Sequence, residues 1–210
     1  MKKNCSIIIE ARMNSSRLPG KVLYKSKNIT MIHLMLKRLK RSKKVKQIIL
    51  ATTKNKKDNK LVNSIKLPVK FFRGSENNVI HRVLSAAKKY NVEHIVKICG
   101  DSPLIDVKIV DKMINLYFMH KPDYMSNNMK KTFPDGMDIE IFPYSTLEKS
   151  YHISKTNLNK EHVTYFIRKS NLFKKLNIKA NKKNFFPKLK LTLDTYNDYI
   201  FLENNLFVAK

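Results

Sequence analysis

Residues 7–23 read IIIEARMNSSRLPGKVL, three isoleucines followed by a loop that carries two arginines, two serines, a Pro-Gly pair and a lysine. Isoleucine favours β-strands because its branched side chain packs well on a pleated sheet. The Pro-Gly pair marks a turn. The stretch therefore predicts a buried strand that Glu10 closes, with a long basic loop behind it.

Along the rest of the chain, short apolar runs alternate with amphipathic helical segments, which predicts one α/β domain over residues 1–210 with a mostly parallel sheet. Strands are expected at residues 4–9, 47–51, 69–72, 94–99, 123–126, 137–142, 176–180 and 188–193. Helices are expected at residues 31–39, 59–65, 79–90, 107–120, 144–151, 160–169 and 197–206. Ligands of such sheets bind beyond the carboxyl ends of the strands, where the basic loop is expected to lie.

The chain is strongly basic, with 43 lysines and arginines against 16 acids and a net charge of +27. Such a charge is compatible with nucleic-acid binding. Most of the basic residues are lysines, however, and the joint excess of lysine, asparagine and isoleucine is the bias that an AT-rich genome produces. No nucleic-acid-binding module is recognisable, and the aromatic residues are not interleaved with the basic runs. We therefore expect no specific nucleic-acid partner and keep a basic nucleic-acid-binding protein as the non-enzymatic alternative.

Several classes of protein are disfavoured by composition. No apolar stretch approaches the roughly 20 residues of a membrane span, so we expect a cytoplasmic protein without a membrane partner. Cys5 and Cys99 lie in apolar runs, which favours small buried side chains over a disulfide. The histidines do not pair with cysteines at the spacing of a zinc site.

The basic loop is a candidate phosphate site. Arg12, Arg17 and Lys21, with Ser15 and the backbone amides near Gly20, could contact several phosphate oxygens. The loop lacks the glycine spacing of a Walker A motif. A basic surface turn is the structural alternative.

Two aspartates are predicted at strand ends. Asp101 follows an apolar strand in CGDSPL, and Asp194 follows another in LTLDT. If the two carboxylates meet at one sheet edge, they could hold Mg²⁺ against the phosphates of a nucleotide. Taken alone, Asp101 could instead cap the following helix.

Two further segments carry charge in a regular pattern. FPDGMDIEIF alternates with period two, which places Asp138 and Glu140 on one side of a strand, and an exposed edge is the structural alternative. KEHVTYFIRK reads as a helix with Glu161 and Arg168 near one face. That pattern is compatible with a solvated helix surface or with recognition of a polar, acidic substrate.

Taken together, IIIEARMNSSRLPGKVL, FFRGSENNVIHRVLSAAKKY, VKICGDSPLID, TFPDGMDIEIF, KEHVTYFIRK and LKLTLDT resemble, in order and spacing, the SpsF family of spore-coat polysaccharide biosynthesis. These proteins look like cytidylyltransferases related to the enzymes that activate 3-deoxy-manno-octulosonic acid and sialic acids as CMP-sugars. The resemblance covers residues 7–195, and its most specific part is the loop after the first strand. Glu10 departs from the pattern, because relatives often have an amide or a proline there.

The resemblance implies a GT-A-like nucleotidyltransferase fold, CTP as co-substrate, Mg²⁺ as cofactor and a homodimer. It implies transfer of CMP from CTP to an acidic sugar, of the nonulosonic or octulosonic type, with release of pyrophosphate for surface polysaccharide synthesis. The implied catalytic residues are Arg12, Lys21 and Asp101. The implied nucleotide-binding residues are Ala11, Arg12, Ser15, Arg17, Gly20, Lys21, Arg73, Ser75 and Gly100. The implied metal ligands are Asp101 and Asp194, and the implied acceptor residues are Asp135, Asp138, Glu140, Glu161, His162 and Arg168.

A glycosyltransferase that consumes a nucleotide sugar on the same type of fold is the enzymatic alternative. Such enzymes commonly carry an Asp-x-Asp motif at a strand end. Here the strand is followed by Asp101-Ser102-Pro103, which disfavours this alternative.

Overall fold

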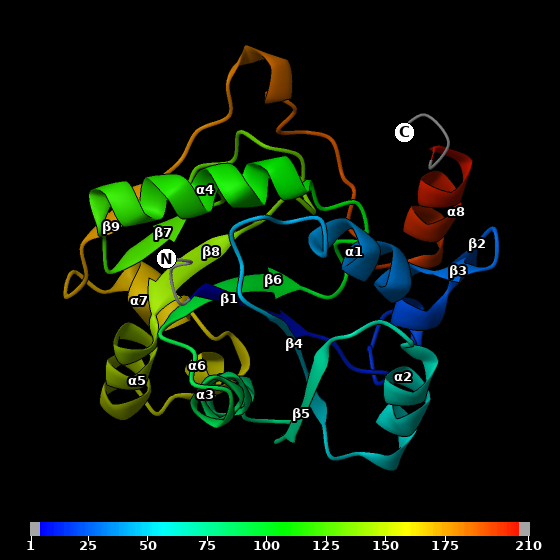
Figure 1. Ribbon diagram of the computed structural model, residues 1–210, viewed down its shortest axis with the longest axis horizontal. Coiled ribbons are helices and arrows are strands. Elements are labelled where there is room, and N and C mark those ends of the chain that lie inside the picture. The colour runs from blue at the N-terminus through cyan, green and yellow to red at the C-terminus, as the bar shows by residue number, and fades with distance from the viewer. Residues whose placement is uncertain (1–4, 206–210) are drawn as a thin grey trace.

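The computed structural model describes residues 5–205, which form a seven-stranded sheet and a two-stranded hairpin (Figure 1). The strands are β1 (Cys5–Glu10), β2 (Lys25–Ser26), β3 (Ile29–Thr30), β4 (Ile48–Thr53), β5 (Lys70–Gly74), β6 (His94–Cys99), β7 (Tyr124–Ser126), β8 (Glu140–Pro143) and β9 (Lys175–Asn177). The α-helices are α1 (Met31–Leu39), α2 (Asn59–Ser64), α3 (Val79–Lys89), α4 (Val107–His120), α5 (Tyr144–Ile153), α6 (Asn157–Glu161), α7 (Tyr165–Lys169) and α8 (Tyr196–Asn205). Short 3₁₀ turns occur at Lys21–Leu23, Lys56–Asp58 and Lys182–Asn184.

The large sheet has the order β5-β4-β1-β6-β8-β7-β9. Its first four strands are mutually parallel, whereas β8 runs antiparallel to both β6 and β7. This arrangement confirms the predicted α/β fold with a mostly parallel sheet. The register pairs Glu10 with Cys99, so β1 and β6 end side by side and the loops that follow them start together.

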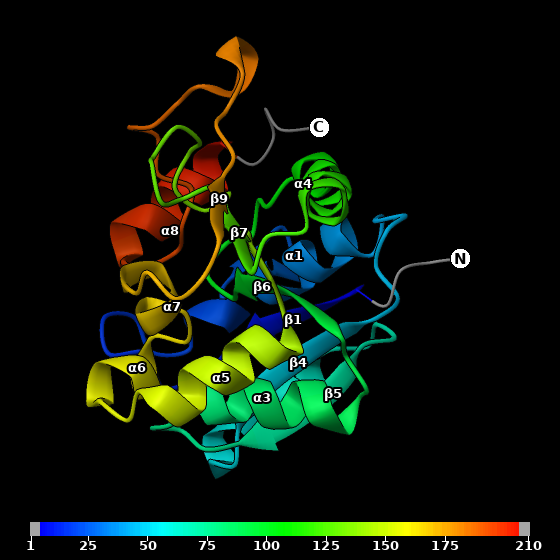
Figure 2. The same ribbon diagram turned by 90° about the vertical axis from the view of Figure 1, so that its left-hand side faces the viewer.

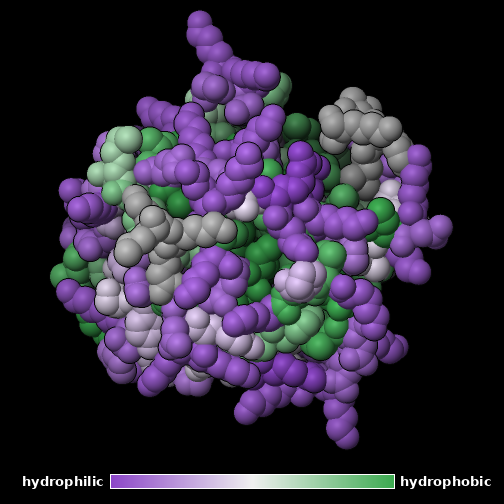
Figure 3. Space-filling view, in the orientation of Figure 1, coloured by the Kyte–Doolittle hydropathy of each residue, from purple (hydrophilic) through white to green (hydrophobic). Residues whose placement is uncertain are grey.

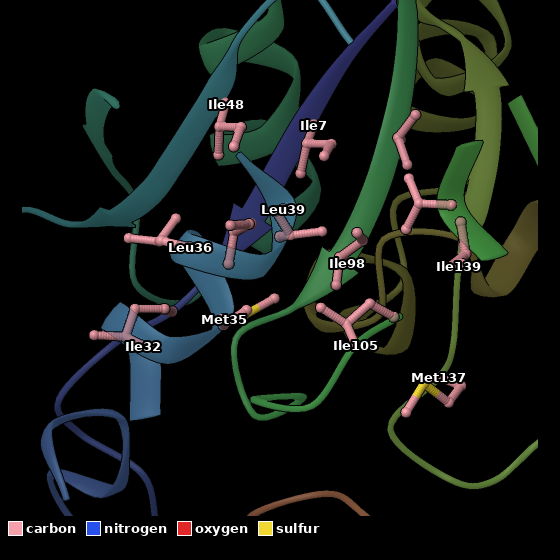
Figure 4. Packing of buried hydrophobic residues seen from close by; sticks show 14 of the residues in the cluster. Ile7, Ile32, Met35, Leu36, Leu39, Ile48, Ile98, Ile105, Met137 and Ile139 are labelled. Atoms are coloured by element: carbon pink, nitrogen blue, oxygen red, sulfur yellow. The ribbon is translucent and has the colours of Figure 1, made fainter. Parts of the chain in front are cut away.

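Helices cover both faces of the sheet, with α1 and α4 on one side and α3 and α5 on the other (Figure 2). Ile7 packs with the first layer and Ile8 with the second, because successive side chains of a strand point to opposite faces. A strand that is covered on both faces needs a continuous apolar run, which the isoleucines of β1 provide. Figure 4 shows Ile7 and Ile98 facing Met35 and Leu39 of α1 in this core.

The outer surface is mostly hydrophilic in the view of Figure 3, with apolar side chains visible between the polar ones. This distribution is consistent with placing many of the lysines on solvated faces. Within residues 5–205, no helix combines the length and the apolar character needed to cross a membrane.

The strand predicted at 188–193 is wrong. This segment makes only an isolated bridge between Asp135 and Lys190, and it runs along loops instead of the sheet edge. The backbone of Leu191 lies so close to Gly136, which has a φ of 98°, that a Cβ there would be 2.8 Å away. The Leu193 amide then donates to the Asp101 carbonyl at 2.8 Å, so the segment's hydrogen bonds go to loops at the strand ends.

The single helix predicted at 160–169 is also wrong, because the chain forms two short helices, α6 and α7, separated by a turn. The Tyr165 amide donates to the His162 carbonyl at 2.9 Å within this turn. The strand predicted at 137–142 begins only at Glu140, so Asp138 does not share a strand face with it. Because β8 lies inside the sheet, the exposed-edge alternative is excluded and Glu140 is buried.

The hairpin β2–β3 was not predicted. Its turn places Lys27 and Asn28 at φ of 44° and 65°, and neither residue is a glycine that would have marked it. Asn4 and Leu206, the outermost residues of the first predicted strand and the last predicted helix, lie outside the described residues.

Candidate active site

Asp58, which is 1% exposed, anchors the basic loop after β1 through hydrogen bonds. Its carboxylate accepts hydrogen bonds from the Met13 amide at 2.7 Å, the Thr52 hydroxyl at 2.7 Å and the Thr53 amide at 3.0 Å. Burial alone would raise the Asp58 pKa, but the hydrogen bonds from Thr53, Met13 and Thr52 outweigh it and the pKa is lowered. The ionised carboxylate therefore ties the loop to the end of β4.

Gly20 closes the same loop. Its φ of 72° lies in the left-handed region, and its amide donates to the Met13 carbonyl at 2.8 Å. The turn directs the next residue, Lys21, inward, where only 11% of its side chain is exposed. A basic loop residue thus becomes a buried part of the site.

Lys21 joins the two strand-end aspartates. Its Nζ lies 2.9 Å from Oδ1 of Asp194 and 3.2 Å from Oδ2 of Asp101. Arg17 adds an ion pair to Asp194 at 2.8 Å. Burial alone would raise the Asp194 pKa, but Lys21, Arg17 and Lys190 outweigh it and the pKa is lowered. The structure therefore brings both aspartates and two of the predicted phosphate-binding cations to one point.

The two carboxylates fit a magnesium site. Their oxygens converge on the same ammonium group, and carboxylate oxygen is the ligand that Mg²⁺ prefers, usually with one or two carboxylates and substrate phosphates. No cluster of three or more His, Cys, Asp and Glu side chains suited to a metal occurs within the described residues 5–205. Asp101 and Asp194 are the residues that could hold such a metal together with the phosphates of a nucleotide.

A first cavity of about 310 Å³ opens above these groups. Gly100 brings the loop after β6 directly against the loop after β1, because a Cβ on Gly100 would lie 2.7 Å from that of Ala11. Most of the residues expected to bind the nucleotide line this cavity. The expected residues in its lining are Ala11, Arg12, Ser15, Arg17, Lys21, Gly100, Asp101, Glu161 and His162.

A second cavity of about 390 Å³ adjoins the first. Glu10, Cys99, Glu161 and His162 line both, so the two are continuous along the ends of β1 and β6. The turn between α6 and α7 forms the far wall. Two further residues expected to bind the acceptor also line it, namely Glu140 and Arg168.

The second cavity includes a buried row of charges. Lys97 lies 3.2 Å from Glu140 and 3.6 Å from Glu10. The Tyr124 hydroxyl donates to Glu140 at 2.9 Å. Burial would lower the Lys97 pKa, but the nearby negative groups, including Glu10 and Glu140, raise it well above its ordinary value. Lys97 therefore stays charged between the two carboxylates.

Six expected site residues do not line either cavity, namely Gly20, Arg73, Ser75, Asp135, Asp138 and Asp194. The Arg73 guanidinium donates to the carbonyls of Thr53 and Asn55, and the Ser75 hydroxyl accepts from a backbone amide. These bonds direct both side chains to the loops around β5. Asp135 pairs with Lys131 at 3.6 Å. Burial, followed by the nearby Asp135 charge, raises the Asp138 pKa to about 6.

Three contributors to the site were missed from the sequence. Asp58 anchors the loop, Lys97 carries the charge in the second cavity, and Arg82 of α3 lines the first cavity. Arg82 is 2% exposed, and its buried Nε has no hydrogen-bond partner among the described residues. The scarcity of arginine in this lysine-rich chain was the one available signal for Arg82.

Comparison with known proteins places the chain among enzymes of nucleotide transfer. The model of a family described as cytidylyltransferase matches residues 6–206. An uncharacterised protein of Methanocaldococcus jannaschii is 38% identical over 199 residues, covering 93% of this chain and 81% of its own. The spore coat polysaccharide biosynthesis protein SpsF of Bacillus subtilis is 29% identical over 204 residues, covering 91% and 82%. A solved cytidylyltransferase of Leptospira borgpetersenii has a TM-score of 0.93 at 38% identity, covering 98% of this chain and 87% of its own.

Proposed function

The chain belongs to the cytidylyltransferase family, and from this membership we propose that it transfers CMP from CTP to an acidic sugar with release of pyrophosphate. The observation that carries the proposal is the junction of the two cavities. One cavity is lined by the phosphate-type cations and Asp101, with Asp194 paired to Lys21 beside it, and the other has polar and charged groups that suit a sugar.

The first cavity suits the triphosphate of CTP. Arg12, Arg17 and Lys21 offer cationic donors on one loop, and Lys21 lies against the aspartates where a metal would be held. Phosphoryl transfer depends mainly on positioning and on neutralising charge, so these cations would stabilise the charge that develops as pyrophosphate leaves. Mg²⁺ held by Asp101 and Asp194 would add to that neutralisation when it is bound.

The second cavity suits an acceptor with hydroxyls and a carboxylate. Arg168 and His162 lie in its wall and could pair with the carboxylate of the sugar. Glu140 and Glu161 offer acceptors for sugar hydroxyls. This distribution supports an octulosonic or nonulosonic acid over a neutral sugar.

The test is pyrophosphate release from CTP and Mg²⁺ with a panel of 3-deoxy-manno-octulosonic, sialic and other nonulosonic acids. Release that requires one panel sugar supports the proposal, and mass spectrometry would identify the CMP-sugar. No release with any sugar, together with no CTP binding, would refute it. Hydrolysis of a UDP-sugar or GDP-sugar instead would favour the glycosyltransferase.

We also propose that the active form is a homodimer in the cytoplasm, where its nucleotide substrate is available. Residues 178–190 project beyond the sheet at the top of Figure 1. Phe185 and Phe186 in this segment are 53% and 54% exposed, which is compatible with burial against a second copy. Light scattering should give twice the chain mass of 24.7 kDa, and Phe185→Ser with Phe186→Ser should reduce it to a monomer. A monomeric wild type would refute the dimer alone.

A further inference from the structure

Glu10 lies at the boundary of the two cavities and lines both of them. It is the last residue of β1, paired in register with Cys99 of β6. Under the proposed function, this is where the α-phosphate in the first cavity meets the attacking hydroxyl in the second.

One oxygen of Glu10 has no hydrogen-bond donor. Oε1 is buried and has no hydrogen-bond partner among residues 5–205, because its ion pair with the Lys97 ammonium, at 3.6 Å, is longer than a hydrogen bond. Lys97 is closer to Glu140, at 3.2 Å. A buried carboxylate oxygen without a donor is costly, so a donor supplied by a ligand would remove that cost.

Charge also distinguishes Glu10 from a simple ion-pair partner. Glu140 already provides Lys97 with a close carboxylate, so pairing Lys97 does not require a second one. Arg82 lines the first cavity, and its charge also acts on Glu10. The carboxylate therefore feels the charge of two cations, at a point that both substrates would share.

We propose that Glu10 is a catalytic residue that accepts the hydrogen bond of the attacking acceptor hydroxyl and takes its proton. The inference rests on the proposed function. As the hydroxyl oxygen forms its bond to the α-phosphorus, its proton passes to the Glu10 carboxylate. The bond from the α-phosphorus to the bridging oxygen breaks, and pyrophosphate leaves with that electron pair. Glu10 then releases the proton to solvent.

The electrostatics of Glu10 suit this role. Burial raises its pKa, while Lys97 and Arg82 lower it and Glu140 raises it, and the net effect is a raised pKa. A carboxylate with a raised pKa is a stronger base, provided that it is ionised at the working pH. The rate should therefore fall on the acid side as Glu10 becomes protonated.

The test compares Glu10→Gln with the wild type in the pyrophosphate-release assay, using the panel sugar with the highest turnover, from pH 5 to pH 9. Glutamine keeps the shape but cannot take the proton. We expect kcat to fall by roughly 10²- to 10³-fold, the acid limb of the pH profile to disappear and the KM for CTP to stay near that of the wild type. Glu93→Gln is the matched control, because Glu93 is exposed and lines neither cavity.

Glu10→Asp provides a second variant if Glu10→Gln does not fold. It keeps the carboxylate, so we expect an acid limb and a higher kcat than that of Glu10→Gln, or of Glu10→Ala where Gln fails. A Glu10→Gln enzyme with the wild-type rate, or with a reduced rate and an unchanged acid limb, would overturn the inference while the proposed function stands. A wild-type chain that binds no CTP and releases no pyrophosphate would overturn both.

Discussion

Lys97→Met should destabilise the protein in a pH-dependent way, because it leaves Glu10 and Glu140 buried without the cation between them. The Lys97 and Glu140 side chains are each only 8% exposed, so water cannot compensate for the lost charge. Removing one partner of a buried pair costs about 3–5 kcal/mol. For a chain of this size, the same loss corresponds to a fall in Tm of roughly 6–20 °C.

The pH dependence has a definite sign. Without Lys97, the folded-state pKa of Glu140 rises above its unfolded value, and the pKa of Glu10, which burial already raises, rises further. Such groups are neutral and cost little at low pH, and their penalty grows as pH rises through the raised pKa. The difference between Lys97→Met and the wild type in the free energy of unfolding should therefore be larger at pH 8 than at pH 5.

Urea denaturation followed by circular dichroism at both pH values measures this difference. Lys112→Met, on the exposed side of α4, controls for the change of residue type. Adding Glu10→Gln and Glu140→Gln to Lys97→Met should recover much of the lost stability. A loss below about 1 kcal/mol, or an equal loss at pH 5 and pH 8, would refute the reasoning.

Four further substitutions test the loop and its surroundings. Lys21→Ala and Asp101→Asn should each lower kcat for pyrophosphate release by roughly 10²- to 10³-fold, because both act where charge develops, and Lys25→Ala should not. Asp58→Ala should lower the free energy of unfolding by about 2–4 kcal/mol in urea, since several buried donors lose their acceptor; near-wild-type stability would contradict this. This contribution is present above the unfolded pKa of Asp58 and is lost as pH falls through its lowered folded pKa. Gly100→Ala should lower the free energy of unfolding by about 1–3 kcal/mol and weaken CTP binding, because the new Cβ would overlap the loop after β1. An unchanged CTP affinity by calorimetry would count against this prediction.

Local patterns predicted most of the fold. The isoleucines of β1 and the apolar stripes of α1, α3 and α4 are buried in the structure. Buried positions recur with the period of a strand or a helix, so the sequence pattern predicts these elements. The strand prediction at 188–193 was wrong because apolar and polar residues alternate there as in a strand, whereas the backbone of the segment pairs with loops. The turn inside 160–169 was missed because its residues do not break a helical pattern.

The site was predictable where one loop supplied it. Arg12, Arg17 and Lys21 were identified from the stretch that follows β1, and Asp101 and Asp194 from their predicted positions at strand ends. Lys97 could not be recognised, because a lysine in a buried strand of a lysine-rich chain gives no signal until its carboxylate partners are placed. Asp58 was likewise hidden, since its donors come from backbone and hydroxyl groups that only the fold brings together.

Calorimetric titration of the protein with CTP, ATP, GTP and UTP in Mg²⁺ tests the central claim most directly. The account predicts that CTP binds at one site per chain, more tightly than the other three. It also predicts that Lys21→Ala weakens the binding of CTP at least tenfold. Lys21 contacts both aspartates at the place where the account puts the phosphates. Absence of CTP binding, equal affinity for all four nucleotides, or an unchanged affinity in Lys21→Ala would contradict it.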